Sequence, residues 1–233
     1  MDKTEFDKFA DEYRSTLAAG ISISGESPDY FADYKIKDLA AEYFTLRRQA
    51  IDAPAVLDFG AGIGTSVPFV RKYLPQASLT CLDVSQRSLE VGQGRFPNQA
   101  RFIPYDGSRI PFADSSFDIA FANCVFHHID HQEHVGLLEE FRRVLNPGGV
   151  AFVFEHNPYN PLTVWIVNNC PFDENARLIR AQVMRQRFLE AGFTQARIRY
   201  RIFFPNALRA LRPLEKNLTW LPLGAQYYVM ASK

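Results

Sequence analysis

Residues 55–64 read AVLDFGAGIG, and this stretch decides the fold. The apolar run at 55–59 predicts a short buried strand, which is followed directly by glycines at 60, 62 and 64. Because glycine lacks a Cβ, it allows a tight strand-to-helix turn and lets a ligand approach the backbone closely. The start of the next helix then presents unpaired N–H groups that suit a carboxylate. The stretch predicts a ligand-binding loop that leads into a helix at 64–74.

Alternating strands and helices continue on both sides of this loop. Further apolar runs predict strands, and the segments between and beside these strands are expected to form helices. The strands are expected at 78–83, 101–106, 117–123, 150–156, 196–204 and 225–232, and the helices at 4–18, 29–50, 85–95, 131–145 and 174–191. Short buried strands separated by helices indicate a parallel α/β sheet covered on both faces.

Length and composition limit the class of protein. The chain has 233 residues, 47% of them hydrophobic, which suits one buried domain. The net charge is zero, but residues 161–233 carry 11 basic and 4 acidic side chains. This imbalance suggests contact with an anionic substrate, or else a solvated surface. Three cysteines without CxxC spacing argue against a disulfide framework. We see no signal peptide and no transmembrane span, which predicts a cytoplasmic location.

An acidic residue follows the glycine loop at the spacing that is typical of a ribose-binding carboxylate. Asp83 ends the second predicted strand, about 20 residues after the loop, where a carboxylate can accept hydrogen bonds from ribose hydroxyls. This arrangement serves either a nicotinamide dinucleotide or S-adenosylmethionine (SAM). The glycines are spaced G-x-G-x-G rather than G-x-G-x-x-G, which disfavours the dinucleotide.

The longer segments resemble one family. VLDFGAGIGTS and LDVS resemble the first two motifs of class I SAM-dependent methyltransferases, and YDGSRIPFADSSFDIAFANCVFHHI with EEFRRVLNPGGVAFVFEH extends the match over residues 55–156. These segments are similar to the ubiquinone and menaquinone C-methyltransferase group, as is the opening FDKFADEYR. The resemblance implies a Rossmann-like, seven-stranded, mostly parallel sheet with a C-terminal antiparallel hairpin.

The resemblance also implies a cofactor site for SAM and its product S-adenosylhomocysteine. Gly60, Ala61 and Gly62 would line the methionine and ribose portion, and Asp58 would support the loop or reach the methionine amino group. The remaining implied contacts are Asp83 with the ribose, Val84, Asp106 and Gly107 with the adenine, Asn123 near the methionine portion, and Tyr13 as a cover.

Catalytic candidates follow the fourth and fifth predicted strands, where open parallel sheets bind ligands. His128 has a side chain suited to a general base, and Glu155 and His156 place polar groups where the acceptor should lie. A purely positional role for His128 is an equal alternative. The cluster lacks zinc-like spacing, so we expect no metal. Cys124 is not expected to be a nucleophile, because activation needs a lowered thiol pKa.

The acceptor is expected to be a small molecule. ANCV at 122–125 does not match the tetrapeptide of amino-methylating nucleic-acid enzymes, and the basic residues form no groove-reading element. We therefore predict no nucleic-acid partner. Residues 1–50 would form a helical cap on a SAM-binding domain at 51–233, with a substrate-cap insertion at about 157–192 that includes Asn168, Cys170 and Asp173. Arg177 and Arg180 would share a helix face that either holds an anionic group or forms a solvated helix start.

The sequence thus predicts a SAM-dependent methyltransferase acting on a small molecule, with an anionic acceptor as one reading of the basic C-terminal segment. Two alternatives stay open, namely a SAM-binding sensor or inactive subunit and a nicotinamide-dependent oxidoreductase. The acceptor, the atom methylated and the oligomeric state are not determined by the sequence.

Overall fold

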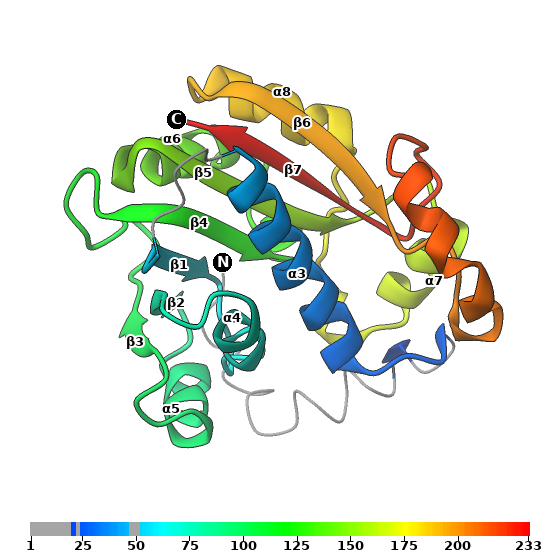
Figure 1. Ribbon diagram of the computed structural model, residues 1–233, viewed down its shortest axis with the longest axis horizontal. Coiled ribbons are helices and arrows are strands. Elements are labelled where there is room, and N and C mark those ends of the chain that lie inside the picture. The colour runs from blue at the N-terminus through cyan, green and yellow to red at the C-terminus, as the bar shows by residue number, and fades with distance from the viewer. Residues whose placement is uncertain (1–19, 22–23, 47–51) are drawn as a thin grey trace.

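Seven strands form one sheet in the order β3-β2-β1-β4-β5-β7-β6 in the computed structural model, which describes residues 20–21, 24–46 and 52–233 (Figure 1). All neighbouring pairs from β3 to β5 are parallel, whereas β7 runs antiparallel to both β5 and β6. The strands are β1 (Ala55–Phe59), β2 (Ser78–Asp83), β3 (Arg101–Pro104), β4 (Phe117–Asn123), β5 (Leu145–His156), β6 (Thr194–Arg201) and β7 (Gln226–Ser232). The predicted sheet and its antiparallel hairpin are confirmed.

Helices cover both faces of this sheet. The α-helices are α3 (Pro28–Leu46), α4 (Val67–Tyr73), α5 (Gln86–Arg95), α6 (His134–Val144), α7 (Pro161–Asn168) and α8 (Ala181–Glu190). Shorter 3-10 segments are η2 (Phe126–His128), η3 (Pro171–Asp173) and η4 (Asn206–Asn217). Two buried apolar clusters form, one beneath α3 and α4 and the other beneath α6 and α8. Both faces of the sheet are therefore covered, as a parallel sheet requires.

Helix α3 crosses the front of the sheet and is tied to its C-terminal strands (Figure 1). The Tyr34 hydroxyl donates a 2.5 Å hydrogen bond to Gln226 of β7, and Arg201 of β6 lies 2.6 Å from the Asp38 carboxylate. The predicted helix at 4–18, Tyr13 included, lies outside the described residues. The boundary between a cap and a core domain remains a prediction.

The helix predicted at 174–191 is shorter than expected. Helix α8 begins at Ala181, because the preceding segment lies beside the β4 turn, where the Arg177 N–H donates to the His127 carbonyl at 2.8 Å. Arg180 is the N-cap residue of α8, and Arg177 is not helical. The prediction that these two arginines share a helix face is therefore wrong.

Helix α7 and segment η4 were not expected from the sequence. The side chain of Asn160 caps α7 by accepting from the Thr163 N–H at 3.0 Å, and Pro161 occupies its first turn. Asn at the cap followed by Pro is a recognised helix start. The sequence did not predict this helix because the Pro and Asn residues of HNPYNPLTV are typical of a loop.

Candidate active site

The glycine loop after β1 has the tight geometry that its composition predicts. Gly60, Gly62 and Gly64 all have positive φ, at 72°, 51° and 75°. The N–H groups of Gly60 and Ala61 both donate to the Leu82 carbonyl at the end of β2. A Cβ on Gly60 would lie only 2.5 Å from a methyl carbon of Val125, so no larger residue fits without displacement.

Asp83 holds the loop from the neighbouring strand. One carboxylate oxygen accepts the Gly62 N–H at 2.7 Å, and the other accepts the Ser85 N–H at 2.8 Å. A carboxylate has about four acceptor positions, so capacity for ribose hydroxyls remains. Asp83 also lines the cavity described below.

Asp58 is the most unusual charged group of the loop region. Its side chain is 1% exposed, and neither carboxylate oxygen has a well-formed hydrogen bond among the described residues. Burial raises its pKa to about 7, and the nearby Ser66 hydroxyl and Lys35 only partly offset that effect. A buried carboxylate with unmet hydrogen-bonding capacity suits a cationic ligand group such as an ammonium.

A cavity of about 310 Å³ starts at this loop and extends toward α3 and α7. Its loop end includes Asp58, Gly60, Gly62 and Asp83. Its lining also includes apolar side chains of α3 and α7. Polar side chains from the end of β4, from η2, from β5 and from η3 form a further part of the lining, which we call the polar wall. That wall contains Asn123, Cys124, His127, His128, His156 and Asp173.

His127 is held between two carboxylates. Its Nδ1 lies 2.5 Å from Glu155, and its Nε2 lies 3.3 Å from Asp173 of η3. Burial opposes the charged imidazolium, but these carboxylates outweigh it and raise the pKa of His127 well above its usual value. Glu155 also accepts the Phe126 N–H at 2.8 Å, which fixes the turn that carries both histidines.

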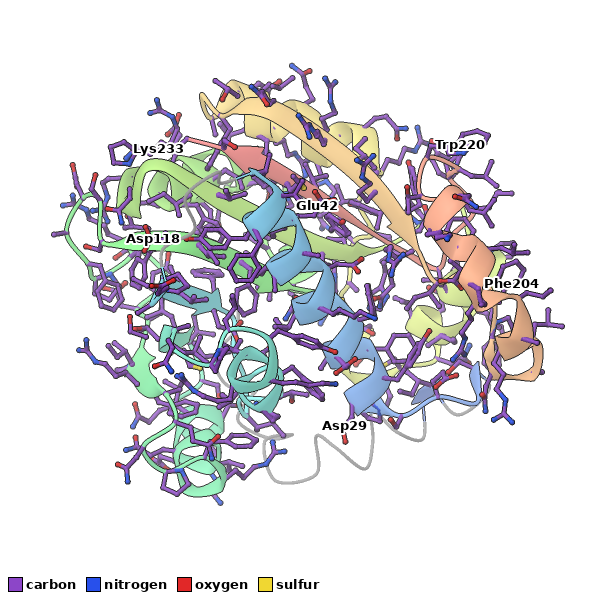
Figure 2. The ribbon with its side chains drawn as sticks, viewed as in Figure 1. Asp29, Glu42, Asp118, Phe204, Trp220 and Lys233 are labelled. Carbon is purple, nitrogen blue, oxygen red and sulfur yellow. The ribbon has the colours of Figure 1, made fainter. Side chains whose placement is uncertain are left out.

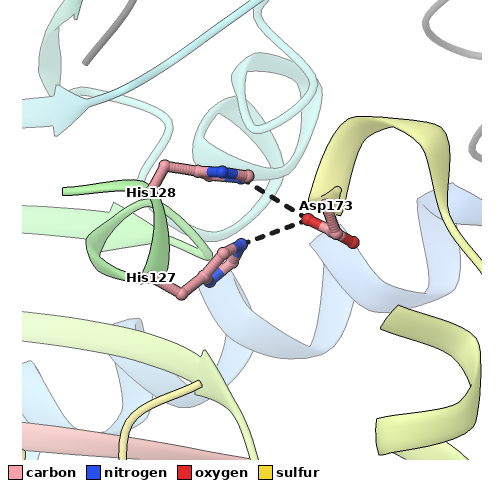
Figure 3. A group of neighbouring side chains, drawn as sticks. All are labelled: His127, His128 and Asp173. Carbon is pink, nitrogen blue, oxygen red and sulfur yellow. Dashed lines mark hydrogen bonds and ion pairs between the residues drawn. The ribbon is translucent and has the colours of Figure 1, made fainter. Parts of the chain in front are cut away.

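His128 and His127 both point toward Asp173 (Figure 3). His128 Nε2 lies 3.5 Å from the Asp173 carboxylate, and candidate ligand atoms of these three residues lie within 4.8 Å of one another. Such spacing is compatible with a metal ion, although hydrogen bonds and ion pairs already connect the groups. Burial and the neighbouring His127 charge lower the pKa of His128 to about 4. His128 is therefore a neutral but weak proton acceptor at neutral pH.

A thiol completes the polar wall. The Lys35 ammonium, from the buried face of α3, donates to Cys124 Sγ at 3.1 Å. Burial would raise the thiol pKa, but Lys35 and His156 outweigh burial and lower it to about 7. The thiol therefore lies in the kind of environment that activation needs, while the prediction that Cys124 is not a covalent nucleophile stays a prediction. The two groups that lower the thiol pKa are Lys35 of α3 and His156 of β5, which lie far apart in the sequence and from Cys124.

The predicted site residues that the structure describes divide into three groups, and Tyr13 lies outside the described ranges. Eight of them line the cavity, namely Asp58, Gly60, Ala61, Gly62, Asp83, Asn123, His128 and His156. Val84, Asp106 and Gly107 lie outside its lining, and Asp106 instead accepts from the Ser108 N–H and hydroxyl, so their adenine contacts stay predictions. Glu155 is 0% exposed and does not line the cavity, so of the two residues after the fifth strand only His156 is placed to face the acceptor.

Lys35 and Gln226 were missed by the sequence analysis. Both are buried and line the cavity, and Gln226 Nε2 lies 3.4 Å from His156 Nδ1. A lysine within the apolar spacing of Phe31, Tyr34 and Leu39 was the available signal, because lysine is rarely buried without a polar partner.

Comparisons with known proteins agree with this geometry. Residues 56–149 match a family model described as a methyltransferase domain. A demethylmenaquinone methyltransferase from Chlorobaculum parvum is 33% identical over 110 residues, which are 47% of this chain and 44% of that protein. A sterol 4-C-methyltransferase from Caenorhabditis elegans is 31% identical over 104 residues, which are 42% of this chain and 30% of that protein. The chain thus spans less than half the length of these relatives.

The fold has solved counterparts over almost the whole chain. A SAM-dependent methyltransferase from Thermotoga maritima, described as a possible histamine N-methyltransferase, superimposes with a TM-score of 0.67 and 17% identity, covering 99% of both chains. At that identity the likeness shows the fold alone. Residues 56–149 of this chain thus match a methyltransferase domain, and its sheet order and overall fold are those of a SAM-dependent methyltransferase.

Proposed function

We propose that this chain transfers the methyl group of SAM to a small-molecule acceptor that binds beside Cys124 and His156. The observation that carries the proposal is the single cavity that joins the glycine loop to the polar wall. A SAM-binding sensor needs only the loop end. A lined space continuing beyond the loop favours a second ligand and hence an enzyme.

The loop end supplies the cofactor contacts. Asp58 would accept from the ammonium of the cofactor's methionine portion, which gives its unsatisfied carboxylate a partner. Asp83 would accept from the ribose hydroxyls while it holds the loop through Gly62. When bound, the cofactor supplies a methyl group activated by a positively charged sulfur. The chain's task is to align the acceptor and exclude water.

The acceptor end favours a molecule with an apolar body and one polar reacting group. Phe31 of α3, Leu162 and Ile166 of α7, and Phe203 line this end of the cavity. Relatives are named for quinone, sterol and thiol methylation, which are activities on apolar or thiol-bearing molecules. We extend that acceptor class to this chain.

Proton removal from the acceptor is assigned to the Cys124–His156 pair. The pKa of Cys124 is about 7, whereas the pKa of His128 is about 4, and a base works best with a pKa near the operating pH. Lys35 and His156 stabilise the thiolate form. Glu155 is a positioning residue that acts through His127.

An anionic group on the acceptor would meet Lys35 rather than the arginines of the C-terminal segment. Lys35 lines the cavity, whereas Arg177 and Arg180 do not. Substituting Arg177 and Arg180 with Ala should therefore leave the acceptor KM unchanged, while Lys35→Ala should raise it.

The test is a turnover assay with SAM and a panel of quinols, sterols and thiols, in which S-adenosylhomocysteine and the methylated product are both detected. We expect turnover with at least one class and loss of kcat in Cys124→Ala. Cys81→Ala is the matched control, because Cys81 is buried in β2 away from the cavity. Cofactor binding without turnover of any acceptor would favour the sensor alternative.

A further inference from the structure

Large apolar side chains are exposed in two segments that flank the acceptor end of the cavity. Eight of the ten exposed large hydrophobic residues of the described chain lie in 159–165 and 208–223, so their exposure is concentrated rather than scattered. The first segment contributes Tyr159, Leu162 and Trp165. The second contributes Leu208, Leu211, Leu214, Trp220 and Leu223. We call these eight residues the Trp/Leu face.

The two segments are joined by hydrogen bonds. Asn160 at the start of α7 donates to the Leu223 carbonyl at 2.9 Å, and Asn157 donates to the carbonyls of Pro222 and Gly224. Figure 1 places α7 beside the segment that follows β6, and Figure 2 places Trp220 at the outer margin of the molecule. The exposed residues therefore belong to one end of the fold.

Local geometry directs these side chains outward. Leu211 and Leu214 lie three residues apart on η4, and a 3-10 helix has three residues per turn, so they share one side. In α7, Leu162 and Trp165 share the exposed side, whereas Thr163 and Val167 are buried on the other. Both segments therefore present large apolar side chains to solvent.

Basic residues accompany the apolar ones. Arg209 and Lys216 are exposed on η4, and Arg180 lies 5.8 Å above the ring of Tyr159. The only acidic residue in 206–224 is Glu215, which is buried and accepts from the backbone N–H groups of Phe203 and Phe204. The exposed charge of that segment is thus entirely positive, which complements an anionic surface.

The Trp/Leu face is continuous with the cavity. Leu162 belongs to both, and Ile166 on the same helix and Phe203 before η4 line the cavity wall. An apolar molecule leaving a bilayer under this face would meet the cavity without crossing bulk water.

We propose that the Trp/Leu face docks this protein on an anionic lipid bilayer and that its acceptor is a lipid-soluble molecule drawn from that bilayer. Exposed Leu and Trp side chains combined with Arg and Lys are typical of proteins that bind at a membrane interface. A bilayer also explains why the face adjoins the cavity, whereas docking of a protein partner would not require that position. The inference rests on the proposed methyl transfer, since it names the class of acceptor. No helix in the described ranges is long and apolar enough to cross a membrane, so the contact is with the bilayer surface.

The experiment is sedimentation of the full chain with vesicles of phosphatidylcholine alone or mixed with phosphatidylglycerol. Both tryptophans of the chain lie in the Trp/Leu face, so their emission reports insertion directly. We expect binding to the anionic vesicles with a blue shift, and a partition coefficient reduced by about tenfold or more in Leu211→Ser/Leu214→Ser. Arg209→Ala/Lys216→Ala should weaken binding to anionic vesicles specifically. Phe44→Ser on α3 is the control that removes a 47% exposed ring elsewhere and should change nothing.

Titration of each variant with S-adenosylhomocysteine separates the two proposals. Unchanged cofactor binding without vesicle binding overturns the docking proposal alone, whereas loss of cofactor binding by the folded wild type overturns the proposed function. A dimer that is dissociated by the same serine substitutions, with no vesicle binding, would assign the face to a second copy and also overturn the proposal. Equal loss of vesicle binding in Phe44→Ser would show that the contact is non-specific.

Discussion

At the residue scale, the buried Asp58 carboxylate destabilises the ligand-free fold when it is ionised, and we explain its presence by a cationic group of the bound cofactor. Burial that raises its pKa from 3.8 to about 7 destabilises the ionised form by at most about 4 kcal/mol. The folded pKa lies above the unfolded one. Its contribution to stability is therefore fully present below about pH 4 and is lost as the pH rises through about 7.

Asp58→Asn should accordingly stabilise the ligand-free protein at pH 8 and have little effect near pH 4, as measured by chemical denaturation at both pH values. The matched control is Asp118→Asn. Asp118 is also buried, but it accepts hydrogen bonds from the Ala55 N–H and the Asn146 side chain, so its substitution should destabilise. A fall in stability of Asp58→Asn at pH 8 would contradict the view that its carboxylate lacks a partner.

Gly60 tests the close packing of the loop. Gly60→Ala would place a Cβ 2.5 Å from Val125 at a φ of 72°, and we expect a loss of about 1–3 kcal/mol in the free energy of unfolding. Gly136→Ala in α6 meets nothing within 4 Å and should be neutral or stabilising by about 0.5–1 kcal/mol. Urea denaturation compares the two, and equal effects would refute the steric argument.

Sequence reasoning at this scale succeeded where partners are close in the chain or share a strand end. Spacing placed Asp83 at the strand end beside the glycine loop, where it lines the same cavity and accepts the Gly62 N–H, while its contact with the ribose stays a prediction. The Lys35–Cys124 contact joins residues 89 positions apart and depends on how α3 crosses the sheet, which no local pattern encodes.

At the element scale, η4 is anchored by one buried carboxylate. Glu215 accepts from the Phe203 and Phe204 N–H groups at 2.9 and 3.0 Å, which ties η4 back to the chain after β6. Glu215→Ala should speed backbone hydrogen exchange across 206–217 and leave cofactor affinity unchanged, as followed by mass spectrometry. Glu139→Ala, on the exposed side of α6, is the control. Unchanged exchange in η4 would show that the anchor lies elsewhere.

Element boundaries were predicted best where strands are buried on both faces. Strands β1, β2 and β4 are almost entirely buried, and their bounds agree with the predicted ranges 55–59, 78–83 and 117–123. Tertiary contacts decided the other cases. Helix α8 begins later than predicted because the preceding Arg177 N–H donates to the His127 carbonyl. Strand β5 begins earlier than predicted because Leu145 pairs with Phe117 of β4, so the strand includes the NPGG segment.

At the scale of the whole molecule, the cofactor and acceptor ends come from different parts of the chain. Residues 56–149 match the family model and hold the loop, whereas α3, α7 and the segment after β6 enclose the acceptor end. This division explains why sequence motifs identify the cofactor but not the acceptor, since fold and cofactor motifs recur with many substrates.

Ligand binding should stabilise the whole fold. S-adenosylhomocysteine at 100 times its Kd should raise the unfolding free energy by about 2.7 kcal/mol, whereas NAD at the same concentration should produce no shift. Thermal denaturation with each ligand measures this. A shift with NAD alone would contradict the SAM site proposed at the glycine loop.

The measurement that tests the central claim most directly is calorimetric titration with S-adenosylhomocysteine of the wild type and Asp58→Asn. The account predicts binding by the wild type and an affinity reduced by about tenfold or more in the variant, equivalent to about 1.4 kcal/mol. Failure of a folded wild type to bind, or equal affinity in both proteins, would contradict the cofactor site built on Asp58.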